Sequence, residues 1–232
     1  MRLVRARQLV LDLPARPALG RADFYVSPAN ALALAQVDAW PGWPDGRIAV
    51  IGPEGAGKTH LVHVWAARTG ARIIASADLT GLDVADVPAV AALAVEDADA
   101  LPDLPDGRRG EEALFHLCNR LRAGGGSLMV TGREPPARWG LKLPDLASRL
   151  GTAGVARLEA PDDDLLSAVL VKLFADRQVD VSPEIIAYLL PRMERSFAGA
   201  ERLVAALDRA ALSQKRAITL RLAAEVLRQG GR

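Results

Sequence analysis

The stretch that decides the fold is IGPEGAGKTHLVHV, residues 51–64. It contains GPEGAGKT, which matches G-x-x-x-x-G-K-[ST], a pattern whose glycines let backbone N–H groups close around phosphate oxygens. In such a loop Lys58 reaches the β and γ phosphates, and the hydroxyl of Thr59 binds Mg²⁺. The apolar run RIAVIG precedes the loop and a helical pattern follows it, so the helix N-terminus adds positive potential. The stretch predicts a nucleotide site, and an ordinary glycine-rich turn is the alternative.

The expected ligand is ADP or ATP with Mg²⁺. The loop residues expected to contact it are Gly52, Pro53, Glu54, Gly55, Ala56, Gly57, Lys58, Thr59 and His60.

The run ALAVEDAD supplies acids where a buried strand is expected to end. Glu96 is expected to hold Mg²⁺ together with Thr59, and Asp97 to orient the attacking water. Aspartate is the usual residue at the first position, and glutamate is one methylene longer, so intrinsic hydrolysis stays an open question. An acidic exit from the strand without a catalytic role is the alternative.

Strand-like runs and helical patterns alternate over residues 45–160. The strand-like runs are RIAVIG, ARIIAS, AVAALAVE, SLMVTG and GVARLE. This alternation predicts a mostly parallel sheet covered by helices on both faces. After Pro161 the pattern becomes purely helical. We expect an extended arm over residues 1–22, an α/β nucleotide-binding domain over 23–160 and a small all-helical lid over 161–232. SPANALALAQVDAW predicts the first helix, with Ser27 as its cap.

Composition narrows the function classes. The 232 residues carry a formal net charge of +1, so the whole molecule is not a general nucleic-acid binder. A single cysteine, Cys118, excludes an internal disulfide framework, and its helical spacing with leucines favours a core position over a nucleophile. No run reaches the roughly 18–20 apolar residues that span a bilayer, and no signal peptide is evident. A cytoplasmic protein without membrane contact is expected.

Three motifs resemble the DnaA-like AAA+ family. GPEGAGKTHLVHV is similar to the phosphate loop of the bacterial initiator DnaA, and LMVTGREPP (residues 128–136) to the sensor-1 strand and its exit. LPDLASRL (residues 143–150) looks like the segment that carries an arginine finger. The resemblance covers roughly residues 22–229. It implies an AAA+ sheet followed by a helical lid.

The resemblance also implies roles for single residues. Arg149 would be an arginine finger that points towards a neighbour's γ-phosphate; a surface arginine, or one paired with Asp145, is the alternative. Thr131 would be the sensor-1 group, although a threonine that ends a buried strand is also ordinary. The family lines its adenine pocket with residues that correspond to Phe24, Tyr25 and Val26, for which core packing is the alternative reading.

One position departs from the family pattern. The family lid carries an arginine that reaches the nucleotide, and the leucine pattern places that position near Ala198. Arg195 or Arg202 would need a shift of one helical turn to replace it. We therefore expect weak or absent intrinsic ATPase activity.

The amino-terminal arm points to one branch of the family. QLVLDL, residues 8–13, resembles the peptide that docks on the replicative sliding clamp. Gln8 would enter a polar notch, and alternate leucines would fill a groove. The apolar positions are Leu9, Leu11 and Leu13. An edge strand that covers the core is the alternative. DnaA continues beyond its lid into a DNA-binding domain, which is not expected in a sequence that ends at Arg232.

These features are similar to the regulatory inactivators of DnaA. The resemblance implies a nucleoid-associated protein, a possible homodimer, that binds the DNA polymerase III sliding clamp (its β subunit) and reaches DNA only through the clamp. There it would stimulate ATP hydrolysis by DnaA and suppress re-initiation. The alternatives are an autonomous AAA+ ATPase and an initiator paralogue that binds DNA with its AAA+ face and basic arm.

Overall fold

The computed structural model describes residues 25–214 and 216–230. The expected arm over residues 1–22, the QLVLDL peptide within it and Phe24 lie outside the described residues. The strands are β1 (Arg47–Ile51), β2 (Arg72–Ala75), β3 (Ala92–Glu96), β4 (Ser127–Gly132) and β5 (Gly154–Arg157). The α-helices are α1 (Ala31–Asp38), α2 (Lys58–Thr69), α3 (Gly107–Gly124), α4 (Pro144–Gly151), α5 (Asp163–Asp176), α6 (Pro183–Leu189), α7 (Phe197–Gln214) and α8 (Leu220–Gly230). Short 3₁₀ segments include η5 (Ala98–Asp103) and η6 (Pro136–Arg138).

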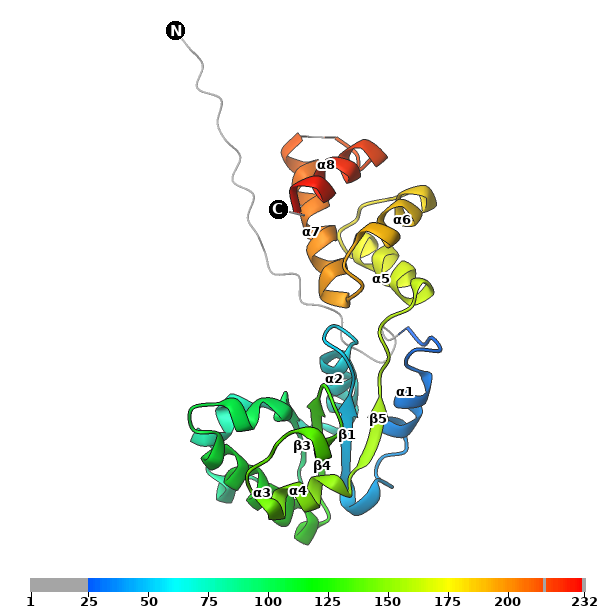
Figure 1. The fold of residues 1–232 in the computed structure, drawn as a ribbon. Helices are drawn as coiled ribbons and strands as arrows, with labels where there is room; N and C mark the ends of the chain where they lie inside the picture. Colours follow the sequence, from blue (N-terminus) through cyan, green and yellow to red (C-terminus); the bar gives the residue numbers. More distant parts are fainter. Residues whose placement is uncertain (1–24, 215, 231–232) are drawn as a thin grey trace.

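The five strands form one parallel sheet in the order β2-β3-β4-β1-β5. β1 lies between β4 and β5, and its Ala49 is in register with Val130 of β4 and Val155 of β5. Parallel strands end at the same edge of a sheet, so the loop after β1 and the exits of β3 and β4 come together there. Figure 1 shows that this edge faces the helical lid.

Helices cover both faces of the sheet, and β1 is buried along its whole length. Side chains alternate between the faces of a strand. Ile48 and Val50 accordingly pack in one core with α1 and α2, while Ala49 and Ile51 pack in another with α3 and α4. A strand covered on both sides needs a continuous apolar run, which RIAVI provides.

The lid consists of α5 to α8 around a core of its own. Phe174 of α5, Leu189 of α6, Leu207 of α7 and Leu222 of α8 are each fully buried in this cluster. Figure 1 shows the lid beyond the edge of the sheet where the phosphate loop lies. The predicted fold class, a parallel sheet covered by helices and followed by a helical lid, is confirmed.

The first helix begins later than its sequence pattern predicts. The chain first makes a turn over residues 27–30, and α1 starts at Ala31. The side chain of Asn30 causes this difference, because its Oδ1 accepts the Ser27 N–H at 3.0 Å and its Nδ2 donates to the Tyr25 carbonyl at 2.9 Å. Ser27 therefore stabilises the turn, accepting from the Ala29 N–H at 3.2 Å, rather than the helix. The hydrogen bond from Asn30 Nδ2 also holds the Tyr25 backbone in place.

Cys118 lies in the core between α3 and the sheet, with 1% of its surface exposed. Burial raises the pKa of its thiol from an ordinary value of 9.0 to about 11. Above pH 9 the unfolded chain loses this proton while the folded chain keeps it, so the stability contribution is lost as pH rises from about 9 to 11. Between about pH 8.5 and 10.5, the unfolding free energy should fall by roughly 1.5–2 kcal/mol more for the wild type than for Cys118→Ala. Urea titrations of both proteins measure this difference. Equal pH dependence in the two would contradict it.

Among the described residues, no helix has the length and apolar character needed to cross a membrane.

Candidate functional site

The phosphate loop between β1 and α2 depends on glycine at two positions. Gly55 has φ +73° and Gly57 has φ +93°, in the left-handed region that favours glycine. A Cβ on Gly55 would lie 2.3 Å from the Ser196 Cβ, and one on Gly57 would lie 2.7 Å from the Phe197 ring. The Phe197 N–H also donates to the Gly55 carbonyl at 3.3 Å. The loop therefore packs directly against the start of α7 in the lid.

Lys58 opens α2, and its ammonium group is held inside the loop. Its Nζ donates to the carbonyl oxygens of Gly52 and Pro53, at 2.9 and 3.0 Å. Burial lowers the pKa of Lys58, and the nearby carboxylates of Asp97 and Asp99 oppose that effect. These contacts place a cation beside backbone N–H groups at a helix N-terminus, an arrangement suited to phosphate.

The acids after β3 are tied to the end of β4. Asp97 has φ +51°, a left-handed conformation that aspartate tolerates better than most residues, and its N–H donates to the Thr131 hydroxyl at 2.9 Å. Asp99 Oδ2 accepts the N–H of Arg133 at 2.7 Å. Thr131 is 1% exposed and is not a cavity-lining residue, so its contact with this part of the site is the hydrogen bond to the Asp97 backbone.

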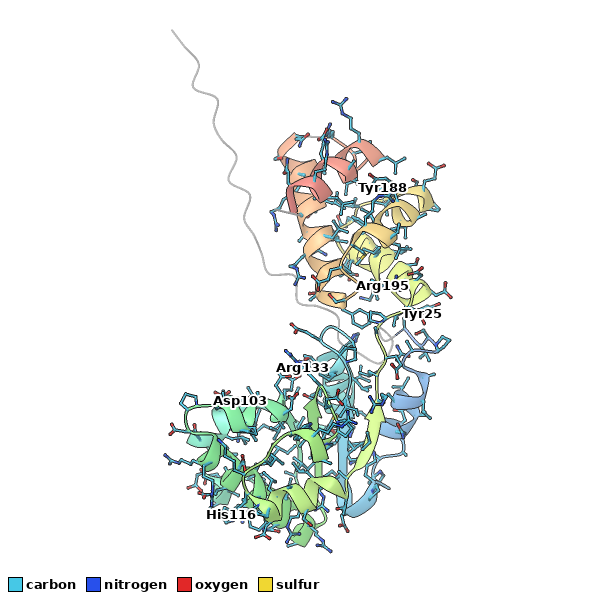
Figure 2. All side chains as sticks on the ribbon, viewed as in Figure 1. Tyr25, Asp103, His116, Arg133, Tyr188 and Arg195 are labelled. Atoms are coloured by element: carbon cyan, nitrogen blue, oxygen red, sulfur yellow. The ribbon has the colours of Figure 1, made fainter. Side chains whose placement is uncertain are left out.

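A cavity of about 1020 Å³ lies between this edge of the sheet and the lid. Eight residues expected at the nucleotide site line it: Tyr25, Glu54, Gly55, Gly57, Lys58, Thr59, His60 and Asp97. Figure 2 shows Tyr25 at the junction of the two parts and Arg133 at the edge of the sheet that faces the lid. The motif residues are thus brought together around one cavity.

Other expected contacts lie outside the cavity lining. Ala56 is buried in the core beneath the loop, and Val26 is exposed over 47% of its surface. Gly52, Pro53 and Glu96 are not lining residues either. Gly52 also has a structural role, because a Cβ there would lie 2.4 Å from the Leu158 carbonyl oxygen.

Several lining residues were not predicted from the sequence. They are Asn30, His63, Asp99, Ala100, Asp103 and Arg133 near the sheet, and Leu165, Val169, Lys172, Leu173, Asp176, Phe197 and Glu201 in the lid. Leu165, Val169 and Leu173 recur every four residues along α5, so they form an apolar stripe that helical periodicity could have revealed. Arg133 carried no such periodic signal.

The residues present are compatible with a magnesium ion that is also bound by phosphates. Mg²⁺ prefers oxygen ligands and usually takes only one or two from the protein. Thr59, Asp97 and Asp99 place such oxygens at the cavity. The Oε1 atom of Glu96 is buried and has no hydrogen-bond partner within the described part of the chain. Residues 25–214 and 216–230 contain no cluster of three or more His, Cys, Asp or Glu side chains that could bind a metal by themselves.

The lid contributes no arginine at the position expected for nucleotide contact. Ala198 of α7 lines the cavity there. Arg195 instead pairs with Asp163 at 2.6 Å, and Arg202 pairs with Glu194. Figure 2 shows Arg195 within the lid. Both neighbouring arginines therefore have partners inside the lid.

Arg149 lies at the opposite end of the sheet from the cavity. Its guanidinium is over the Phe115 ring, 5.4 Å from the centroid. The Thr152 hydroxyl donates to the Arg149 carbonyl at 3.0 Å and accepts from Arg47 Nη2 at 3.3 Å. Arg47 is the first residue of β1, whose far end leads into the phosphate loop. Five strand residues span roughly 16 Å, so Arg149 is far from the nucleotide site of its own chain.

Glu111 of α3 positions the helix that carries Arg149. Its side chain is fully buried, and its two carboxylate oxygens accept the N–H groups of Lys142 and Leu143, at 3.1 and 2.7 Å. These N–H groups lie at the N-terminus of α4, where a negative charge is favourable. Figure 1 shows α4 at the end of the sheet remote from the lid.

Solved structures share this architecture. Domain III of the replication initiation protein DnaA from Thermotoga maritima aligns with a TM-score of 0.78 at 18% identity, covering 94% of this chain and 98% of that one. Residues 162–227 match a family model described as Hda, lid domain. The chain therefore has the AAA+ fold, and its lid matches the Hda lid model over residues 162–227. The resemblance drawn from the sequence motifs is thereby confirmed.

Two further structures show how widely this AAA+ fold is shared. AMPPCP-bound DnaA from Aquifex aeolicus aligns with a TM-score of 0.66 at 18% identity, covering 82% of this chain and 65% of that one. A mutant of RuvB from Thermotoga maritima aligns with a TM-score of 0.60 at 17% identity, covering 78% and 62%. These likenesses concern the fold, and the Hda lid match concerns residues 162–227.

Proposed function

We propose that this chain is a nucleotide-bound regulator of replication initiation that stimulates ATP hydrolysis by DnaA. The observation that carries the proposal is the position of Arg149, at the end of α4 and across the sheet from the chain's own cavity. An arginine placed there serves a nucleotide held by a neighbouring molecule. The DnaA-like fold and the Hda lid support DnaA as that neighbour.

ADP or ATP is the proposed ligand of the cavity. Lys58 and the loop N–H groups would hold the phosphates, with Thr59 and Glu96 beside Mg²⁺. The apolar stripe of α5, together with Tyr25, offers a surface for the base.

The chemistry is divided between two molecules in this proposal. With Ala198 the lid lacks an arginine at the position expected to reach the nucleotide, so hydrolysis in this chain's own cavity is expected to be weak. An arginine finger supplied by a partner is worth about 10³–10⁵ in rate for other nucleotide hydrolases. Arg149 would provide that charge to ATP bound by DnaA. The consequence is inactive, ADP-bound initiator and suppressed re-initiation.

The sliding clamp is the proposed recruiting partner. The Gln8–Leu13 peptide would bind the β subunit of DNA polymerase III, and DNA would be reached through the clamp. Such tethering raises the effective concentration of the regulator near DnaA without new contacts to it.

The clamp peptide can be tested by phosphate release from ATP-loaded DnaA in the presence of DNA-loaded clamp. We expect the wild type to accelerate release, and a Gln8→Ala/Leu9→Ala variant to lose most of this acceleration, because it cannot be tethered. An Arg5→Ala/Arg7→Ala variant keeps the peptide and should act like the wild type. Loss of activity in the arginine variant alone would favour direct DNA binding by the arm. No acceleration by the wild type would overturn the proposed function.

A further inference from the structure

We propose that Arg47 is a positioning residue for Arg149. Through Thr152 it fixes the C-terminal end of α4, the turn from which the Arg149 side chain projects. The inference rests on the proposed function, because it requires that Arg149 acts on a nucleotide bound by a partner. It gives a role to a buried arginine that belongs neither to the phosphate loop nor to the cavity lining.

Arg47 is a buried cation with an incomplete set of partners. It is the first residue of β1, and its side chain is 4% exposed. Its Nη2 donates to Asp45 Oδ2 at 2.8 Å and to the Thr152 hydroxyl at 3.3 Å. Its Nε and Nη1 are buried and have no hydrogen-bond partner within the described part of the chain. Burying a charge is unfavourable unless it is paired and hydrogen-bonded. The stability of the fold is therefore a poor explanation for an arginine at this position.

The contacts of Arg47 lead to the end of α4 that carries Arg149. Thr152 is the C-cap of α4, and its hydroxyl donates to the Arg149 carbonyl at 3.0 Å while it accepts from Arg47. The C-terminus of a helix carries partial negative charge, so a cation beside it is favourable. α4 has only eight residues, and short helices depend on contacts with the rest of the protein. Arg47 therefore helps to hold the last turn of α4 in place.

Buried charges of opposite sign lie at the two ends of α4. The carboxylate of Glu111 accepts two backbone N–H groups at the N-terminus of the helix, and Arg47 lies beside its C-terminus. Both charges match the sign of the helix dipole at their end. The backbone of Arg149 is thus fixed by side chains from two other elements, α3 and β1.

The charge of Arg47 also acts on the Arg149 side chain. Burial is the main cause of the raised pKa of the Cys118 thiol, and the positive charges of Arg47 and Arg149 both oppose it. The two guanidinium groups are therefore within electrostatic range of the same buried atom. Like charges repel, and salt screens the repulsion less when a charge is buried. Arg47 thus opposes an inward rotation of Arg149.

No carboxylate holds Arg149 back from a partner. Within the described residues Arg149 forms no ion pair, and its guanidinium lies over the Phe115 ring. Asp45, at the start of β1, is occupied by Arg47 at 2.8 Å and lies 3.9 Å from Arg122. By binding Asp45, Arg47 keeps this carboxylate from neutralising the finger.

The test titrates this chain into a fixed amount of ATP-loaded DnaA with DNA-loaded clamp and follows phosphate release in a single turnover. The titration separates the maximal rate from the concentration that gives half of it. Arg47→Met removes the charge and its hydrogen bonds and leaves an unbranched apolar side chain. It should lower the maximal rate by about tenfold to a hundredfold, because misplacing a catalytic group by about 1 Å can cost that much. The half-maximal concentration should stay unchanged.

Two further variants separate positioning from a loss of folding. Thr152→Val removes the hydroxyl that joins Arg47 to α4, at an exposed position. It should lower the maximal rate by about threefold to tenfold, as expected for the loss of one hydrogen bond. Arg47→Lys keeps the charge but loses the planar fork, so its rate should lie between those of the wild type and Arg47→Met.

Arg72→Met is the matched control. Arg72 opens β2 as Arg47 opens β1, but it is exposed and lies at the far edge of the sheet. This variant should keep full stimulation. Thermal unfolding should show that Arg47→Met is at least as stable as the wild type, because exchanging a buried charge for an apolar side chain is often neutral or stabilising.

The outcomes separate this inference from the proposed function. A full maximal rate for Arg47→Met or for Thr152→Val, beside an inactive Arg149→Ala, would overturn the inference alone. A rate that a high concentration of Arg47→Met restores would also overturn it, because weaker binding to DnaA would then explain the loss. Full stimulation by Arg149→Ala would instead remove the proposed arginine finger on which the role of Arg47 depends.

Discussion

Arg149→Ala should abolish the stimulation of DnaA while leaving this chain folded and able to bind nucleotide. We expect the stimulated rate of phosphate release to fall by about 10³-fold or to the rate of DnaA alone, because an arginine supplied in trans stabilises charge on the transferring phosphoryl group. The chain's own cavity should be unaffected, since Arg149 lies at the other end of β1. Single-turnover phosphate release from ATP-loaded DnaA, with DNA-loaded clamp, measures the effect.

Two further variants sharpen this experiment. Arg149→Lys keeps the charge but loses the planar fork, so its rate should lie between those of the wild type and Arg149→Ala. Arg122→Ala removes another exposed arginine, one that lies 3.9 Å from Asp45, and should retain full stimulation. Full stimulation by Arg149→Ala would refute an arginine finger at this position. Loss of nucleotide affinity in the same variant would show that its effect is structural.

Lys58→Ala should weaken nucleotide binding by about a hundredfold. The ammonium is the cation held at the centre of the phosphate loop, and hydrogen bonds to charged groups are worth about 1.5–3 kcal/mol each. Nucleotide that binds only the folded state stabilises it by about 2.7 kcal/mol at 100 times its dissociation constant. At a concentration that raises the melting temperature of the wild type, the variant should therefore show almost no shift.

Lys142→Ala is the comparison for this measurement. Lys142 donates its Nζ to the Pro102 carbonyl at 2.9 Å, and it lies outside the cavity lining. It should keep the full thermal shift with ADP. Lys58 also donates hydrogen bonds to the carbonyls of Gly52 and Pro53, so its loss can change the stability of the loop. The melting temperatures of the wild type and both variants without ligand are therefore compared first. A normal shift for Lys58→Ala would show that the cavity does not bind phosphate as the motif predicts.

Local sequence patterns predicted most of the secondary-structure elements. The glycine loop between an apolar run and a helical pattern predicted β1, the loop and α2, because strand, turn and helix chemistry agree over adjacent residues. The change to purely helical patterning after Pro161 predicted α5 to α8 of the lid. The predicted start of α1 was wrong because the side chain of Asn30 forms hydrogen bonds with backbone groups before the helix. The periodicity of apolar residues gives no sign of such bonds.

The residues of the candidate site likewise differ in whether local sequence patterns could predict them. Lys58 and Thr59 were predicted because their function depends on spacing within one loop. The place of Arg133 in the cavity lining was not predicted, because its contacts are with Asp99 and Glu54, which are 34 and 79 residues away in sequence. Thr131 was expected near phosphate; in the structure its hydroxyl accepts the Asp97 N–H, and its contact with phosphate stays a prediction.

The sequence by itself determined that this chain has a phosphate loop, an alternating α/β region and a helical segment that follows it. These are properties of neighbouring residues, set by backbone conformation and by the periodicity of apolar side chains. Only the tertiary structure decided which ends of the strands meet, that the lid closes one side of the cavity with Ala198, and that Arg149 lies across the sheet from it. The physical reason is that parallel pairing brings distant segments to one edge of the sheet, and the identity of the contacts made there depends on packing between residues far apart in the chain.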